Sequence, residues 1–205
     1  MKIIAVGMNY AEHNKELDST LVIRNEPVIF MKPDSALLKD GKPFFIPDFS
    51  DEVHYETELV VKICRLGKNI AERFAHRYYE EVTVGIDFTA RDLQRKAREI
   101  GNPWEICKGF DDSAAVGKFV SLDKFSGIQN LNFHLDIDGN KVQQGNTADM
   151  LFKVDEIIAY VSRFFTLKIG DLIFTGTPVG VGPVAIGQHL QGYLEEEKLL
   201  DFYIR

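Results

Sequence analysis

The sequence contains little of what marks disulfide-rich, metal-thiolate or membrane proteins. Its 205 residues include only two cysteines, Cys64 and Cys107, and these do not form a CxxC pair. We therefore predict two reduced thiols, neither of them a metal ligand. No apolar run approaches the length of a membrane span, and the apolar stretch at residues 1–7 is far shorter than a signal-peptide core. We expect a soluble, cytoplasmic protein.

Basic residues are also in the minority. The chain has 24 lysines and arginines against 31 aspartates and glutamates, which gives a net charge of -7. This balance argues against a nucleic acid or an anionic membrane as the main partner, although basic residues could still gather in one pocket. With 45% hydrophobic residues the chain can bury a full core, and its length suits a single domain.

One apolar strand carries acids where an ordinary buried strand would carry none. Residues 53–63 read VHYETELVVKI, and the side chains of His54, Glu56 and Glu58 fall on the same face of such a strand. Two acids held together in a half-buried setting raise each other's pKa unless a cation lies between them, and a hard divalent ion is the usual partner. A solvated polar face has the same pattern, so this strand leaves both interpretations open.

A second apolar strand, residues 82–88, is followed at once by a predicted helix. Thr89 and Asp92 have the spacing of a capping box, and Gly101 would end the helix. Its apolar stripe would consist of Leu93, Ala97 and Ile100.

Capping accounts for Asp92 but leaves Asp87 unexplained. Asp87 lies within the apolar strand, where an unpaired carboxylate would be costly to bury. If it meets Glu56 and Glu58, the three acids supply the oxygen ligands that Mg²⁺ or Mn²⁺ prefers.

A short helix is predicted near the N-terminus, where Asn9 and Glu12 have the spacing of an N-cap and an N3 residue. His13 and Glu16 on this helix are spaced i, i+3 and therefore lie within hydrogen-bonding reach. A carboxylate bonded to one imidazole nitrogen makes the other nitrogen a better base, which is the arrangement that activates a water molecule. A surface ion pair has the same spacing, and the spacing does not separate the two.

Two later segments carry groups that could face the acids. Lys108 lies between apolar residues and Gly109, where it could reach a carboxylate or hold an anionic substrate; an exposed lysine is the alternative. Residues 175–183, TGTPVGVGP, leave backbone N–H groups and hydroxyls free to approach a ligand carboxylate. The segment lacks the Gly-Lys-Ser/Thr of a phosphate-binding loop, and by itself it predicts only a turn.

The remaining patterns favour strands over helices. Residues 131–137 alternate cleanly between apolar and polar, and a turn at 138–139 leads into a second hairpin strand. Helices are predicted for 69–78, with Asn69 as the cap and Ile70, Phe74 and Tyr78 as the stripe, and from Asp155 to residue 165. Because strands and helices do not alternate regularly, we predict a β-rich α+β fold.

Together these segments resemble the fumarylacetoacetate hydrolase (FAH) family. The resemblance spans almost the whole chain and rests on residues 6–13 (VGMNYAEH), 30–33 (FMKP), 54–59 (HYETEL), 87–94 (DFTARDLQ), 108–111 (KGFD), 144–147 (QGNT) and 170–178 (GDLIFTGTP). It implies a mixed β-sheet rolled around the site, with a few short helices. It also implies one catalytic domain over residues 1–205, in which residues 1–50 supply an N-terminal strand, a lid helix and loops, and residues 51–205 the metal-binding β-roll.

The resemblance also implies roles for particular residues. The metal ligands would be Glu56, Glu58 and Asp87, holding Mg²⁺ or Mn²⁺, with Ca²⁺ as an ion that could occupy the site in a crystal. The catalytic residues would be His13 and Glu16, as the water-activating dyad on the lid, and Lys108 beside the metal. The substrate-binding residues would be Tyr10, Arg91, Gln94, Gly176 and Thr177. Met8 stands where family members often have arginine, so a substrate contact made by that arginine has no counterpart here.

The predicted activity is metal-dependent hydrolysis of a C–C bond in a small 2,4-dioxo acid, such as an acylpyruvate or fumarylpyruvate, through an enolate that the metal stabilises. The same enolate would serve an isomerase acting on a 2-hydroxyhepta-2,4-diene-1,7-dioate or an oxaloacetate decarboxylase. The presence of His13 and Glu16 favours hydrolysis. A non-catalytic, metal-stabilised binding protein is an alternative of a different class. The family resemblance further implies a homodimer.

Overall fold

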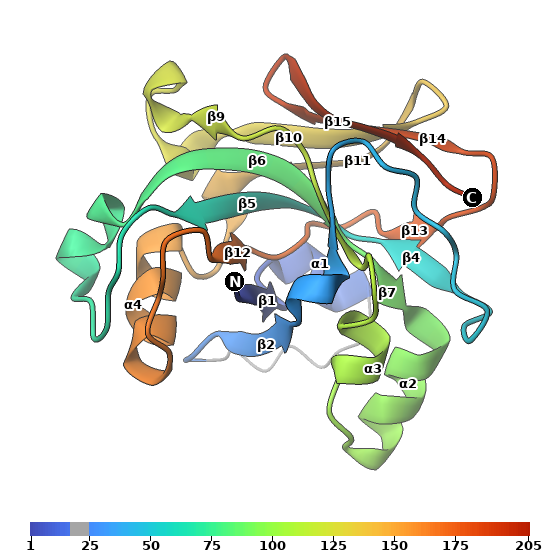
Figure 1. Cartoon of the computed structure of the whole chain (residues 1–205), viewed down its shortest axis with the longest axis horizontal. Coiled ribbons are helices and arrows are strands. Elements are labelled where there is room, and N and C mark those ends of the chain that lie inside the picture. Colours follow the sequence, from blue (N-terminus) through green and yellow to red (C-terminus); the bar gives the residue numbers. More distant parts are fainter. Residues whose placement is uncertain (17–24) are drawn as a thin grey trace.

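The computed structural model describes residues 1–16 and 25–205, and the side chains of these residues except 14–16. Its main sheet contains the strands β1 (Ile3–Gly7), β2 (Val28–Lys32), β3 (Leu37–Leu38), β5 (Thr57–Ile63), β6 (Tyr79–Asp87), β8 (Ala114–Val116), β9 (Val120–Ser121) and β12 (Leu172–Phe174). Their spatial order is β2-β1-β12-β5-β6-β8-β3, with β9 paired to β6. Figure 1 shows how β5 and β6 curve across the molecule.

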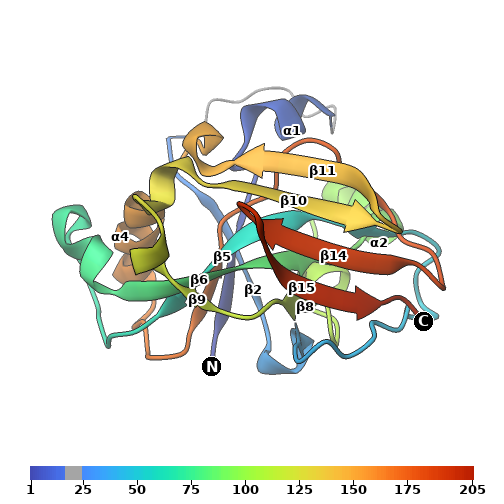
Figure 2. The same cartoon turned by 90° about the horizontal axis from the view of Figure 1, so that it is seen from above.

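Two further sheets complete the fold. A four-stranded sheet has the order β11 (Asn140–Asn146), β10 (Asn132–Ile137), β14 (His189–Leu194) and β15 (Glu197–Tyr203). Seen from above, it covers the curved sheet (Figure 2). The third sheet is small and joins β13 (Gly182–Pro183), β4 (Val53–Tyr55) and β7 (Thr89–Ala90).

The helices are few and short. They are α1 (Ala11–Glu16), α2 (Arg91–Ile100), α3 (Glu105–Lys108) and α4 (Val154–Phe164), and the longest 3₁₀ segment is Glu72–Arg77. Together with the mixed sheet, in which β1 pairs parallel with β12 and antiparallel with β2, they confirm the predicted β-rich α+β fold. None of the described helices combines the length and the apolar composition that crossing a membrane requires.

The core lies against the curved sheet. The strands β5 and β6 are buried along most of their length, as their runs of valine and isoleucine predict. Helix α4 packs against the same core with Val154, Ile157, Ile158 and Val161, which recur at helical spacing and are fully buried. The predicted helix at 155–165 is thus confirmed with a start one residue earlier.

The predicted strand at residues 53–63 is divided at Glu56. β4 ends at Tyr55 and pairs with β7 and β13, whereas β5 begins at Thr57 and pairs with β6 and β12. Alternation alone does not reveal such a break, because both halves continue the strand pattern. Glu56 therefore lies where the chain passes from the small sheet to the large one.

The helix starts predicted at Asn9 and Asn69 were wrong. Helix α1 begins at Ala11, and the buried Asn9 amide instead bridges loops, donating to Phe152 O at 3.0 Å and to Thr175 O at 2.7 Å. Asn69 has a left-handed φ of 51°, and only a 3₁₀ segment follows, with Phe74 39% exposed.

Helix α2 forms where expected but turns a different face inward. Its N-cap is Ala90 instead of the predicted Thr89, and Gly101 ends it in the left-handed conformation as predicted. Ile100 is 70% exposed, so the predicted apolar stripe is wrong; the buried residues of the helix are Arg91 and Gln94. Because these polar groups face the interior, they must find partners there.

Candidate metal centre and substrate pocket

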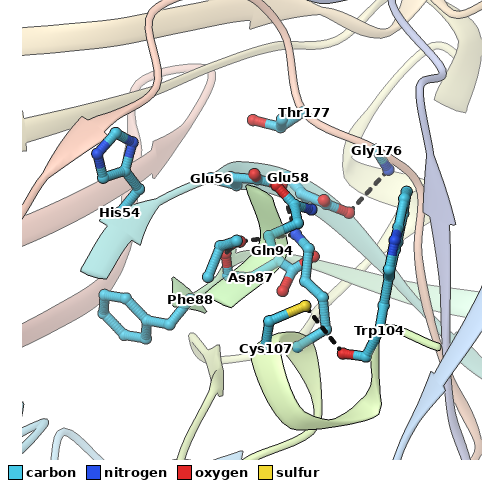
Figure 3. A network of polar contacts seen from close by, with 12 residues as sticks. His54, Glu56, Glu58, Asp87, Phe88, Gln94, Trp104, Cys107, Gly176 and Thr177 are labelled. Carbon is cyan, nitrogen blue, oxygen red and sulfur yellow. Dashed lines mark hydrogen bonds and ion pairs between the residues drawn. The ribbon is translucent and has the colours of Figure 1, made fainter. Parts of the chain in front are cut away.

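Three buried carboxylates meet at the start of β5. Glu56, Glu58 and Asp87 each offer one oxygen atom, and these atoms lie within 4.8 Å of one another. The pairing of β5 with β6 places Asp87, the last residue of β6, beside the start of β5. Figure 3 shows the three side chains converging. The acids that the sequence singled out therefore lie together, as a metal site would require.

Cations neutralise two of these carboxylates. Lys108 Nζ lies 2.8 Å from Glu56 Oε2 and 2.7 Å from Asp87 Oδ2. Arg91 Nη2 lies 2.5 Å from Glu56 Oε1, and Lys32 Nζ lies 2.6 Å from Asp87 Oδ1, an ion pair without hydrogen-bond geometry. Burial acts to raise the pKa of Glu56, but Lys108 and Arg91 outweigh it and hold that pKa below its usual value.

Glu58 differs from its two neighbours. Its Oε2 atom accepts a hydrogen bond from the Gly176 N–H at 2.7 Å, and no cation among the described side chains pairs with it. Burial, followed by the charges of Asp87 and Glu56, raises the pKa of Glu58 well above its usual value. The raised pKa favours the protonated form of Glu58 in the metal-free protein, and a bound divalent ion would displace that proton and pair with the carboxylate.

Lys32 is the main residue of this site that the sequence analysis missed. Its side chain is fully buried, and Nζ donates to Ser113 O at 2.9 Å and to Ser113 Oγ at 3.0 Å, and also to the Lys108 carbonyl. Burial lowers the pKa of Lys32, while the neighbouring Asp87 acts in the opposite direction. Lys32 lies in the segment 30–33 (FMKP) that contributes to the family resemblance, but nothing in the local sequence distinguishes it as a residue of the site.

The carboxylates line a pocket whose walls come from seven helices and strands and the loops between them. The lining residues are Val6, Gly7, Met8, His13, Phe30, Glu56, Glu58, Asp87, Arg91, Gln94, Arg98, Trp104, Lys108 and Thr177. The acids, Arg91, Gln94, Lys108 and Thr177 are buried, whereas Met8 is partly exposed and Arg98 exposed. The pocket therefore has a charged interior, and Arg98 brings an exposed basic group to it.

Helix α2 supplies a fixed arginine to the interior. Besides its ion pair with Glu56, Arg91 donates from Nη1 to Gln94 Oε1 at 2.5 Å and from Nε to His54 Nδ1 at 3.5 Å. His54 Nε2 lies 2.8 Å from Glu52 Oε1. Since Nδ1 accepts from Arg91, the imidazole proton lies on Nε2, which donates to Glu52. Burial and the charge of Arg91 lower the pKa of His54, which favours this neutral form.

The glycine-rich loop contributes Thr177 and Gly176 in different ways. Thr177 Oγ1 donates to Thr57 O at 2.9 Å and accepts from Gln143 Nε2 at 2.8 Å, so its hydroxyl is fixed at the pocket wall. Gly176 has a φ of 98°, and a Cβ there would lie 2.7 Å from Asn9 Cβ, so only glycine fits. Its N–H donates to Glu58 and so supports the carboxylate, while the substrate contact of Gly176 stays a prediction.

Gln143 is a second residue without a predicted role. It is 3% exposed, and its Oε1 atom accepts from Thr57 N at 2.9 Å, at the first residue of β5. Its Nε2 atom donates to Thr177 and to Pro178 O at 2.9 Å. One side chain thus ties the start of the acidic strand to the glycine-rich loop.

The N-terminal segment supplies one of its three predicted site residues to the pocket. His13 is 4% exposed and lines the pocket. Glu16 is the last residue of α1, and its side chain lies outside the described residues, so the dyad stays a prediction. Tyr10 belongs to the main hydrophobic core and is not among the described residues that line the pocket.

Comparison with known proteins agrees with this geometry. The family model described as fumarylacetoacetate (FAA) hydrolase C-terminal matches residues 2–203. An oxaloacetate tautomerase of Escherichia coli (strain K12) is 42% identical over 92% of this chain and 86% of the relative. A mitochondrial oxaloacetate decarboxylase of Dictyostelium discoideum is 42% identical over 91% of this chain and 85% of the relative.

A solved structure shows the same fold with ligands. Fumarylpyruvate hydrolase from Pseudomonas aeruginosa, in complex with Mn²⁺ and pyruvate, superposes with a TM-score of 0.93 at 34% identity, over 100% of this chain and 89% of that one. The chain belongs to the fumarylacetoacetate hydrolase C-terminal domain family, and the resemblance found in the sequence is confirmed. Its relatives include proteins named as a tautomerase, a decarboxylase and a hydrolase.

Proposed function

We propose that this chain is a divalent-metal-dependent enzyme that interconverts the keto and enol forms of a small 2-oxo acid of the oxaloacetate type. The observation that carries the proposal is the uncompensated Glu58 within a buried set of three acids, in a pocket that also contains a fixed arginine. The tautomerase name of a relative 42% identical to this chain supports the choice of reaction.

The metal would be held by Glu56, Glu58 and Asp87. Carboxylate oxygens suit Mg²⁺ and Mn²⁺, and the Mn²⁺ in the related hydrolase structure supports this choice. When bound, such an ion supplies Lewis-acid stabilisation of the negative charge that an enolate carries.

The charges around the three acids fit an anionic group of the substrate. Lys32, Arg91 and Lys108 pair with Glu56 and Asp87, and none of them pairs with Glu58. A bound divalent ion would replace the Glu58 proton, and this set of described groups together with the ion would then carry more positive than negative charge. In the enolate of a 2-oxo acid the first carboxylate and the enolate oxygen are both negative, so the excess positive charge would stabilise the charge that develops during the reaction.

The side chains of the pocket would bind and orient the substrate. We assign the substrate carboxylate and keto oxygen to Arg91 and Gln94, which line the pocket and are buried. Thr177 also lines the pocket, but its hydroxyl donates to Thr57 O, so it would donate to a substrate oxygen only by exchanging that hydrogen bond. Lys108 donates to Glu56, Asp87 and the Thr89 hydroxyl, so its three N–H groups are engaged and it acts through its charge. His13 would remove and return the proton on the carbon beside the keto group.

Hydrolysis of a 2,4-dioxo acid is the second candidate, and the position of His13 favours it. A buried imidazole at the pocket can activate water instead of moving a substrate proton, with Glu16 as the predicted partner. The fumarylpyruvate hydrolase name of the structural neighbour supports this reaction, and the decarboxylase name of the Dictyostelium relative supports loss of carbon dioxide from the same enolate.

A substrate panel separates these reactions. The protein is incubated with oxaloacetate, acetylpyruvate or fumarylpyruvate in the presence of Mg²⁺ or Mn²⁺, with and without a chelator. Tautomerisation is followed as loss of enol absorbance without pyruvate formation, decarboxylation as pyruvate with carbon dioxide, and hydrolysis as pyruvate with a second acid. We expect chelator-sensitive tautomerisation of oxaloacetate, with the circular dichroism spectrum unchanged.

Two outcomes of the panel would contradict the proposal. Turnover that persists in chelator would remove the metal from the reaction. Absence of all turnover, together with unfolding on chelation, would support the non-catalytic, metal-stabilised binding protein instead.

The assembly and location of the protein are also proposals. We propose a single catalytic domain over residues 1–205 that forms a homodimer in the cytoplasm, on the basis of the family resemblance. Light scattering of the purified protein tests the dimer, and a monomer at micromolar concentration would contradict it.

A further inference from the structure

One basic residue of the pocket has no part in the reaction proposed above. Arg98 lies on α2, seven residues after Arg91 and four after Gln94, so all three project from one face of the helix. All three line the pocket, but Arg91 and Gln94 are buried, whereas Arg98 is exposed. The helix therefore presents a row of polar groups that runs from the interior of the pocket towards solvent.

No carboxylate among the described side chains pairs with Arg98. Arg91 pairs with Glu56, and Lys108 pairs with Glu56 and Asp87. Among the side chains that the structure describes, Arg98 has no ion-pair or hydrogen-bond partner. It is thus the pocket-lining cation, within the described part of the chain, that remains available to an anion.

We propose that Arg98 binds the second carboxylate of a dicarboxylic 2-oxo acid, and so selects diacids over monoacids of equal length. This inference rests on the proposed function, in which Arg91 and Gln94 hold the first carboxylate and the keto oxygen. Seven residues of helix span about 10 Å along the axis, and side chains tilt towards the helix N-terminus, which shortens the reach to the substrate. The guanidinium can hold a carboxylate through two parallel hydrogen bonds.

Matched pairs of 2-oxo acids that cannot undergo oxaloacetate-type decarboxylation or 2,4-dioxo hydrolysis test the inference by binding instead of by turnover. The Mn²⁺-loaded protein is titrated by calorimetry with 2-oxoglutarate and 2-oxopentanoate, and with 2-oxoadipate and 2-oxohexanoate. Within each pair the ligands differ only in the terminal carboxylate. We expect the wild-type protein to prefer the diacid of at least one pair by about five- to tenfold, as an Arg–carboxylate contact near the surface would give.

Substitutions at two positions of α2 show whether Arg98 causes the preference for the diacid. Arg98→Gln should bring the ratio of the two dissociation constants close to one, and Arg98→Lys should keep part of the preference, because lysine retains the charge but not the planar fork. Lys96→Gln is the matched control: it removes one exposed positive charge from the same helix at a position that does not line the pocket. It should leave the preference intact.

The outcomes distinguish this inference from the proposed function. A wild-type protein that turns over oxo acids but binds both members of each pair equally would overturn the role of Arg98 alone. Equal loss of preference in Lys96→Gln and Arg98→Gln would also overturn it, because long-range charge would then explain the effect. If no 2-oxo acid binds and none is turned over, the proposed function itself fails.

Discussion

Asp87 and Asp201 have similar partners in very different surroundings. Asp87 lies within 2.7 Å of the ammonium groups of Lys32 and Lys108, and its side chain is 1% exposed. Asp201 lies on β15, in the four-stranded sheet. Its carboxylate is 2.6 Å from both Lys198 Nζ and His189 Nε2, and its side chain is 44% exposed. The two clusters therefore compare the same kinds of contact with and without solvent.

The comparison indicates that burial determines how much an ion pair contributes to the free energy of unfolding. At the surface, water screens the pair and solvates either partner if the other is removed, so the net contribution is small. In the interior, each charge has lost its hydration, and a missing partner leaves an uncompensated charge. In the buried network around Asp87, removing one charged group is therefore expected to destabilise the protein by leaving its partners uncompensated. Around Asp201, a single substitution is expected to have a small effect on stability.

The largest effect is expected from removing the buried ammonium of Lys32. Lys32→Met should lower the free energy of unfolding by about 3 to 5 kcal/mol, because it removes one of the two ammonium partners of the buried Asp87. Chemical denaturation of the metal-free protein measures this loss. The matched control is Lys62→Met, which removes a half-exposed lysine paired with Glu81 and should cost less than about 1 kcal/mol. Equal losses for the two variants would refute the comparison.

Glu58→Gln is expected to separate metal binding from stability. Metal affinity should fall by more than about 100-fold, since even residues that only support ligands change it by about 10- to 100-fold. The metal-free protein should be at least as stable as the wild type, because the substitution replaces a buried carboxyl with a raised pKa by a neutral amide. Calorimetric titration with Mn²⁺ and thermal unfolding measure the two quantities. Glu81→Gln serves as the control, and a destabilised metal-free Glu58→Gln protein would argue against the raised pKa.

The pH dependence should differ in sign between Glu58 and Glu56. The folded protein holds the Glu58 proton to a higher pH than the unfolded chain, so this group lowers the stability of the metal-free protein as pH rises above about 4.5. Glu56, whose pKa is lowered, contributes stability that is lost as pH falls below that value.

The pH dependence of metal binding reports on the protonation of Glu58. Because the ion displaces the Glu58 proton, Mn²⁺ affinity should rise with pH, and titrations in buffers of different ionisation enthalpy should detect the released proton. An affinity that is constant with pH between 5 and 8, a range of about 3 units in which carboxyls of raised pKa titrate, would contradict this assignment.

The smallest effect is expected at the surface cluster. Hydrogen bonds from Lys198 and then His189 lower the pKa of Asp201 to about 2, yet the exposed position limits what this contributes. Asp201→Asn should change the free energy of unfolding by less than about 1 kcal/mol, and the change should shrink further in high salt. Denaturation at low and high ionic strength checks both statements, and a loss as large as that of Lys32→Met would show that exposure is not the deciding factor.

The sequence predicted those parts of the site that follow from local spacing. Glu56 and Glu58 are two residues apart at the start of a strand, so their proximity follows from strand geometry even though the strand breaks at Glu56. Asp87 attracted attention because an acid in an apolar strand needs a partner, and that partner is now visible as Lys108 and Lys32. The left-handed Gly101 and helix α4 also followed from local rules.

Other features depended on contacts between residues distant in sequence. Lys32 lies 55 positions before Asp87, and no local rule distinguishes it from the exposed lysines of the chain. Gln143 looked like an ordinary hairpin residue until the fold brought it to Thr57 and Thr177. We predicted a buried apolar stripe for helix α2 because most helices of globular proteins bury an apolar face. In the structure the buried residues of this helix are Arg91 and Gln94.

By itself, the sequence determined the strand-rich class of fold, the family and the three acids, because hydrophobic periodicity and residue type act over a few residues and leave a readable pattern. The tertiary structure alone decided which carboxylate stays without a cation. Which carboxylate lacks a cation depends on the positions of Lys32, Lys108 and Arg91 in the buried interior. These residues are distant in sequence, so their electrostatic interactions form only when the chain has folded.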